Sequence, residues 1–129
     1  MSRDPYKLEA FQLADSLVVE LYRASARFPA AERFGLQAQL RRAAVSVAAN
    51  LVEGCARRSQ RDYLHFVGIA IGSASEVRYL VQLSARLGFI DQAAGDKVAY
   101  GYGRVVRALQ SLVSVIESGR GPRPEVRGP

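Results

Sequence analysis

The sequence predicts an all-α protein, folded as an antiparallel, up-down-up-down four-helix bundle that forms oligomers. Alanine, valine and leucine are the commonest apolar residues, tryptophan is absent and aromatic residues make up only 9% of the chain, which favours packed helices over a β-sandwich. Four long segments carry apolar residues at helical spacing, and the connections between them are short. Short connections favour antiparallel neighbours, so we expect residues 1–118 to form one bundle domain.

Proline and glycine delimit the first two helices. The first is predicted over residues 5–27, with Asp4 as its N-cap. It ends ahead of Pro29, because the residue before a proline is pushed out of the α region. The second is predicted over residues 31–57, and Gly35 in its first turns indicates an irregular start.

The third and fourth helices carry clearer end signals. The third is predicted over residues 59–87, because Ser59 opens a capping-box-like segment and Gly88 is a typical left-handed cap. Asp91 caps the fourth, which extends to about residue 117.

Glycine and proline weaken the C-terminal part of the chain. Gly101 and Gly103 fall inside the fourth helix, where each costs about 1 kcal/mol against alanine. Residues 119–129, GRGPRPEVRGP, contain too few apolar groups to order themselves, so we expect a flexible tail there.

The segment QLRRAAVSVAANLVEG, residues 39–54, combines an apolar composition with regularly spaced polar groups. At about 100° per residue, one narrow stripe of this helix carries Gln39, Arg42, Ser46, Asn50, Glu53 and Arg57. Ser73, Ser75 and Glu76 on the third helix offer partners. We expect a hydrogen-bonded ladder at a helix–helix seam, with a role in packing register rather than in catalysis.

The rest of this second helix is apolar on two sides. A core face is formed by Leu36, Leu40, Val47 and Leu51. Most of the remaining circumference is occupied by Ala38, Val45, Ala48, Ala49, Val52 and Ala56. Burial on both sides predicts a homo-oligomer with this helix at the interface, whereas the alternative is a monomer with an alanine-lined surface. On the third helix, Gly68-x-x-x-Gly72 would let another helix approach closely.

The net charge of +6 comes mainly from arginine, since only Lys7 and Lys97 of the 18 basic residues are lysine. This charge predicts contact with RNA or DNA phosphates without sequence reading, or is simply a solvated surface. The candidate nucleic-acid contacts lie near the two bundle ends and on the fourth helix: Arg27, Arg33, Arg57, Arg58, Arg61, Arg104 and Arg107. Arg41 and Arg42 are assigned instead to bundle or subunit contacts.

Enzymatic activity, metals and cofactors are not expected. His65 is the only histidine, and the single cysteine, Cys55, cannot form an internal disulfide. Arg57 and Arg58 would lower the pKa of Cys55, but a lone helical cysteine is more often a small hydrophobe. The first residues lack the apolar segment of a signal peptide and no run of 18 apolar residues occurs, so we expect a cytoplasmic protein without membrane contact.

A long motif in this chain resembles a known family. It runs Pro29-x-x-Glu32-x-x-Gly35-Leu36-x-x-Gln39-Leu40-Arg41-Arg42-Ala43 and continues with Ser46, Asn50, Glu53, Gly54, Phe66, Ala70, Gly72, Ser73 and Glu76. Over residues 8–116 the sequence resembles the four-helix-bundle family named for 23S ribosomal RNA intervening-sequence proteins.

The resemblance implies an antiparallel four-helix bundle assembled as a ring-like homopentamer. It also implies genes placed within ribosomal RNA inserts or, in a related branch, a retroelement accessory protein that binds reverse transcriptase and nucleic acid. Our functional hypothesis is therefore a non-enzymatic oligomeric scaffold that binds nucleic acid, and the alternative is an adaptor for a protein partner.

Overall fold

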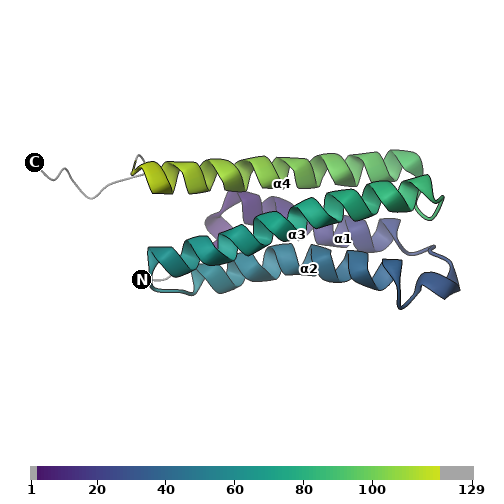
Figure 1. Cartoon of the computed structure of the whole chain (residues 1–129), viewed down its shortest axis with the longest axis horizontal. Coiled ribbons are helices and arrows are strands. Elements are labelled where there is room, and N and C mark those ends of the chain that lie inside the picture. Colours follow the sequence, from purple (N-terminus) through teal and green to yellow (C-terminus); the bar gives the residue numbers. More distant parts are fainter. Residues whose placement is uncertain (1–2, 120–129) are drawn as a thin grey trace, which may run out of the picture.

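The computed structural model describes residues 3–119, and this part of the chain contains helices and no strands (Figure 1). The elements are η1 (Pro5–Lys7), α1 (Glu9–Ala24), η2 (Ala30–Glu32), α2 (Leu36–Cys55), α3 (Gln60–Arg86) and α4 (Gln92–Ser118), where η denotes a 3₁₀ turn. The predicted all-α class with four long helices is confirmed. The predicted tail falls on residues 119–129, all of which except Gly119 lie outside the described range.

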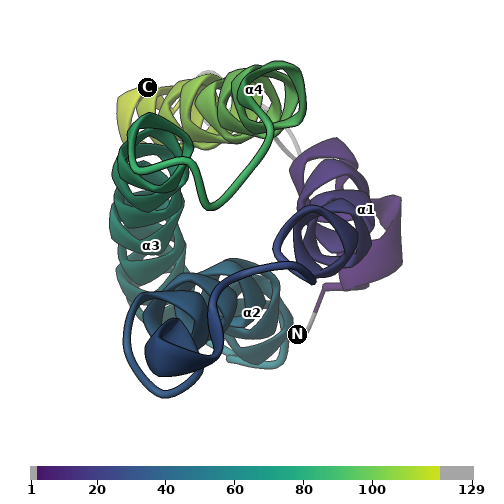
Figure 2. The same ribbon diagram turned by 90° about the vertical axis from the view of Figure 1, so that its right-hand side faces the viewer.

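The four α-helices surround one apolar core. Viewed end-on, α1 lies beside α2 and α4, and α3 lies beside the same two helices on the opposite side (Figure 2). The α1–α2 and α3–α4 connections lie at one end of the molecule, and the α2–α3 turn lies at the other (Figure 1). Every helix contributes fully buried side chains to the core, such as Leu21, Leu51, Val77 and Leu109.

The helix ends follow the predicted capping signals. The carboxylates of Asp4 and Asp91 and the hydroxyl of Ser59 each accept a backbone N–H in the first turn that follows. Gly88 has a φ of 80°, the left-handed conformation that a glycine after a helix adopts without a Cβ penalty.

The first helix is shorter than predicted. Asp4 caps only the turn η1, and α1 begins separately at Glu9. At its other end α1 stops at Ala24, because the next residue, Ser25, is fully buried and is held by side chains from α2. Gln37 Nε2 donates to the Ser25 carbonyl at 2.7 Å, and Arg41 Nε donates to its hydroxyl at 2.9 Å.

The second helix also begins later than predicted, at Leu36 rather than near residue 31. The irregular start expected at Gly35 is present, since the 3₁₀ turn η2 precedes it. The Glu32 carboxylate accepts the Leu36 N–H at 3.1 Å and so occupies a free donor of the first turn of α2. Among residues 3–119, no helix is long and apolar enough to cross a membrane.

Candidate nucleic-acid interface

Polar side chains of α2 and α3 meet in a ladder along the seam between these helices. Ser46 and Ser73 hydroxyls lie 2.9 Å apart, and Asn50 Nδ2 donates to both the hydroxyl and the carbonyl of Ser46. Gln39 Nε2 donates to a Glu76 carboxylate oxygen at 3.4 Å. These hydrogen bonds either join the two helices or orient a side chain that does. Each contributes about 1 kcal/mol of stability to the register in which the helices pack.

The two arginines of this segment do not take part in the ladder. Arg42, which we expected within it, is exposed and makes no hydrogen bond or ion pair to any residue from 3 to 119. Arg41 points toward α1 instead, where it donates to Ser25 and to the Tyr22 carbonyl and stacks 4.4 Å from the centre of the Tyr22 ring. The ladder continues beyond Asn50 only as the ion pair between Glu53 and Arg57.

The α2–α3 turn forms a basic end of the bundle. Arg58 and Arg61 are exposed there, and no carboxylate between residues 3 and 119 lies within ion-pair distance of either. Arg57 is less available to a ligand than Arg58 or Arg61, because it pairs with Glu53 and its guanidinium lies 4.9 Å from the centre of the Phe66 ring.

The N-terminal segment adds basic residues that the sequence analysis did not assign to this end. The Arg3 amide donates to the Cys55 carbonyl at 2.7 Å, and its guanidinium lies 3.9 Å from the centre of the Tyr63 ring. Lys7 lines the same hollow as Arg3 and Cys55. In segments 3–8 and 53–66, basic residues outnumber acidic ones. The basic residues are Arg3, Lys7, Arg57, Arg58 and Arg61, and the acidic residues are Asp4, Glu53 and Asp62.

Arg27 and Arg33 are exposed at the opposite end of the bundle. The Arg33 guanidinium lies 5.4 Å from the ring centre of Phe34, which is itself 88% exposed. A helix as long as α3 spans about 40 Å at 1.5 Å per residue, so these two arginines and the α2–α3 turn cannot form one site within a single chain.

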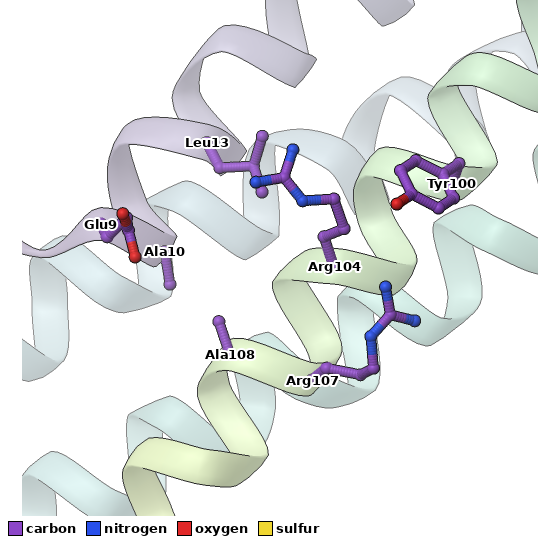
Figure 3. A pocket seen from close by; sticks show the side chains of 7 residues that line it. All are labelled: Glu9, Ala10, Leu13, Tyr100, Arg104, Arg107 and Ala108. Atoms are coloured by element: carbon purple, nitrogen blue, oxygen red, sulfur yellow. The ribbon is translucent and has the colours of Figure 1, made fainter.

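Arg104 and Arg107 lie midway along α4, away from both ends. They line a groove between α4 and α1 together with Tyr100, Glu9 and Leu13 (Figure 3). The structure brings a further arginine to this face, Arg78 of α3, which the sequence analysis missed. Since α3 and α4 are joined at residues 87–91, counting outward from that connection pairs Arg78 with position 100, about one helical turn before Gly103, and this count is the signal that brings it near this face.

The second flank of α2 is exposed in the single chain. Val45 and Val52 are each 43% exposed, and they form one wall of a shallow groove whose other wall is Val18 and Val19 of α1. On α3, Gly68 and Gly72 have no heavy atom near the position of an added Cβ, so no helix of the same chain approaches them among residues 3–119.

The buried ionisable groups are held in their neutral forms. Burial raises the pKa values of Cys55, Tyr63 and Tyr102. For Cys55 this corrects the expectation that Arg57 and Arg58 would lower its pKa, because its 2% exposure outweighs nearby charge and the cation that opposes the shift is Arg3. Its behaviour as a small hydrophobe is confirmed. No cluster of three or more histidine, cysteine or acidic side chains suited to a metal ion occurs in residues 3–119.

Comparison with known proteins identifies the family. The sequence model described as "23S rRNA-intervening sequence protein" matches residues 6–111. A solved structure from Bacteroides thetaiotaomicron, described as a protein of unknown function from the S23 ribosomal protein family, superposes with a TM-score of 0.74 at 19% identity and covers 81% of this chain and 95% of its own. At this identity the likeness establishes the fold alone, and no curated protein matches the chain. Because the family model spans most of the sequence, the chain belongs to the family of 23S rRNA-intervening sequence proteins.

Proposed function

We propose that the protein is a non-enzymatic, homo-oligomeric scaffold that binds RNA or DNA through basic surfaces without strong sequence specificity. The observation that carries this proposal is the pair of exposed arginines at the α2–α3 turn, Arg58 and Arg61, which have no carboxylate partner between residues 3 and 119. An arginine guanidinium can donate two parallel hydrogen bonds to the oxygens of one phosphate. Phosphate contacts by themselves carry no information about the base sequence. The family name, which refers to ribosomal RNA, agrees with a nucleic-acid ligand in the cytoplasm.

The salt dependence of binding tests this proposal. We expect the affinity of the full chain for a fluorescein-labelled RNA 20-mer to fall steeply between about 50 and 200 mM salt, as expected for released counterions. In the double variant Arg58→Ala/Arg61→Ala, the slope of log K against log salt should become less negative by about 1.4 for a single strand, or 1.8 for a duplex, per contacting protomer.

The matched control is Arg23→Ala/Arg86→Ala, which removes the same charge from exposed positions at the other end of the bundle. This control should change the slope by much less. Binding that is independent of salt, or equal losses in the two double variants, would contradict the assignment of phosphate contacts to the α2–α3 turn.

The proposal includes assembly of an up-down-up-down antiparallel bundle into an oligomer, with a ring of five copies as the expected form. It is supported by the alternation of the helix connections between the two ends and by the exposed valines of α2. Burying them against a second copy would contribute about 25 cal/mol per Å² of apolar surface.

Sedimentation velocity at micromolar concentration tests the assembly. We expect the wild-type chain to sediment as an oligomer and Val45→Asp/Val52→Asp to dissociate it, because a carboxylate in an apolar interface is desolvated without a partner. Leu87→Asp, at an exposed apolar position outside the groove, is the control and should leave the oligomer intact. A wild-type chain that sediments as a single polypeptide would refute this part of the proposal.

A second candidate function is an adaptor that binds a protein partner such as a reverse transcriptase. The observation that favours it is Phe34, whose exposed ring adjoins a groove lined by Tyr22, Arg33, Gln37, Ala38, Arg41 and Arg42. Exposed aromatic and arginine side chains are typical of protein interfaces. A partner that stays bound after nuclease treatment and is lost in Phe34→Ala would support the adaptor, whereas loss with nuclease alone supports the scaffold.

A further inference from the structure

Two arginine side chains from different helices converge on Gly103. A Cβ added at this glycine would lie 3.5 Å from Arg107 Nη1 and 3.5 Å from both Nε and Cζ of Arg78. The two guanidinium groups are therefore separated by at most twice that distance. Gly103 is buried, and these two long side chains lie over the position that its Cβ would occupy.

The positive charge around Gly103 has no acidic ion-pair partner among residues 3–119. The ion pairs found among residues 3–119 are Glu53 with Arg57 and Glu20 with Lys97, and neither involves Arg78, Arg104 or Arg107. Two unpaired guanidinium groups at this separation repel each other weakly in water. An oxyanion placed between them would remove the repulsion and accept charge-assisted hydrogen bonds from both.

The neighbouring groove supplies a third arginine and an aromatic ring. Arg104 reaches across the outside of α4 toward Leu13 of α1, and Tyr100 lies one turn before it on the same helix (Figure 3). Tyr100 is 67% exposed, so its ring offers a free face to a ligand. Among the described residues that line the groove, Glu9 is the one acidic residue, and it lies on the opposite wall, on α1.

We propose that this surface, which we name the Gly103 face and define as Arg78, Tyr100, Arg104 and Arg107, binds single-stranded nucleic acid. The backbone phosphates lie between the guanidinium groups of Arg78 and Arg107 and against Arg104. An unpaired base stacks on the Tyr100 ring. A duplex satisfies only the phosphate contacts, because its bases are stacked on one another and cannot reach the ring.

This inference rests on the proposed nucleic-acid binding and specifies its ligand. It also separates the Gly103 face from the basic turn between α2 and α3, where phosphate contacts alone are proposed and no base has to be unpaired. The two surfaces can therefore be tested independently in the same chain.

The test compares a labelled oligo(U) 20-mer with a labelled duplex of the same length by fluorescence anisotropy, using the full chain. The wild type should bind the single strand more tightly than the duplex. Tyr100→Ala should weaken single-strand binding about 5- to 150-fold, the effect of losing one base–aromatic stack, and leave duplex affinity unchanged. Tyr100→Phe should keep the wild-type affinity, since stacking needs the ring and not the hydroxyl.

The arginines have a different expected signature. Arg78→Gln/Arg107→Gln should make the single-strand salt slope less negative by about 1.4, because two phosphate contacts are lost. Tyr79→Ala and Arg86→Gln, at exposed positions on α3, are the matched controls and should bind as the wild type does. Circular dichroism verifies the fold of each variant, and the Tyr100 pair provides the test if the double arginine variant does not fold.

Two results would overturn the inference. One is a Tyr100→Ala chain that binds the single strand as the wild type does, and the other is an equal loss of single-strand and duplex affinity in that variant. If Arg58→Ala/Arg61→Ala still weakens binding in either case, the proposed function stands and only the Gly103 face is wrong. A wild-type chain that binds neither probe refutes both.

Discussion

Two of the glycines of α4, Gly101 and Gly103, offer a direct test of how closely the helices pack. Gly101 faces α1, where an added Cβ would lie 2.6 Å from Leu17 Cδ2 and 3.0 Å from Cδ1. At Gly103 the nearest atoms to an added Cβ, from Arg78 of α3 and from Arg107 of α4 itself, lie at 3.5 Å. We expect Gly101→Ala to destabilise the protein and Gly103→Ala to stabilise it, although the two positions are two residues apart in one helix.

The magnitudes follow from two opposing terms. Alanine gains about 0.8–1.0 kcal/mol of helix propensity over glycine at either position. At Gly103 ordinary van der Waals contact adds nothing unfavourable, so the net gain is about 0.5–1 kcal/mol. At Gly101 the new methyl group approaches Leu17, which is only 3% exposed, about 1 Å closer than carbon atoms normally come, and overpacking of this kind costs about 1–3 kcal/mol. The two variants should therefore differ by about 1–3 kcal/mol.

Urea unfolding followed by circular dichroism measures this difference. The protein concentration must be equal for all variants, because assembly shifts apparent stability by mass action. Changes in the midpoint at an unchanged m-value report the free energy of unfolding.

A double-mutant cycle with Leu17→Ala identifies the cause. In that background the methyl group introduced at position 101 no longer overlaps a side chain, so Gly101→Ala should become stabilising by about 1 kcal/mol. The reasoning fails if Gly101→Ala is as stable as Gly103→Ala in the wild-type background, or if Leu17→Ala leaves the effect of Gly101→Ala unchanged.

Two further predictions concern the buried ionisable groups. Burial raises the pKa of Tyr102, whose hydroxyl makes no hydrogen bond within residues 3–119. Above about pH 10 the unfolded chain releases this proton while the folded chain keeps it, so the free energy of unfolding should fall by up to about 1.4 kcal/mol per pH unit. Tyr102→Phe should reduce that slope and raise the free energy of unfolding at pH 7 by about 1–2 kcal/mol, because the buried hydroxyl without a partner is removed. Urea titrations at several pH values measure both effects. Burial raises the pKa of Cys55, so its thiol should react slowly with Ellman's reagent at about pH 8 in the native protein and rapidly in urea. Full reaction of the native sample within the mixing time would contradict the burial of this thiol.

Local signals in the sequence were sufficient for the helices, their caps and the core face of α2. Ser59, Asp91 and Gly88 act on the backbone within three residues, and Leu40, Val47 and Leu51 repeat at helical spacing, so each can be read without knowing the neighbours. The ends of α1 and the start of α2 were predicted less well. They depend on Ser25 and its bonds to Gln37 and Arg41, which join residues 12 and 16 positions apart.

Among the candidate binding residues, too, some were predicted from local sequence and others were not. The sequence identified Arg58 and Arg61 because Arg58 lies in the turn between α2 and α3 and Arg61 in the first turn of α3, at a bundle end where long side chains reach solvent. It placed Arg42 in a ladder from which the structure excludes it, and it did not assign Arg3 to the basic turn, because that contact is made through the distant Cys55 carbonyl at the far end of α2.

The sequence by itself thus determined that this chain forms four helices, the last two with side-chain caps, and which side chains form the core face of α2, since periodicity and capping act over one or two turns. Only the tertiary structure decided which side chains from different helices meet: Arg78 with Arg107 over Gly103, and Leu17 against Gly101. The physical reason is that these meetings depend on how far one helix is shifted along another and how closely the two approach. Both quantities are fixed by the packing of the whole core rather than by any single segment.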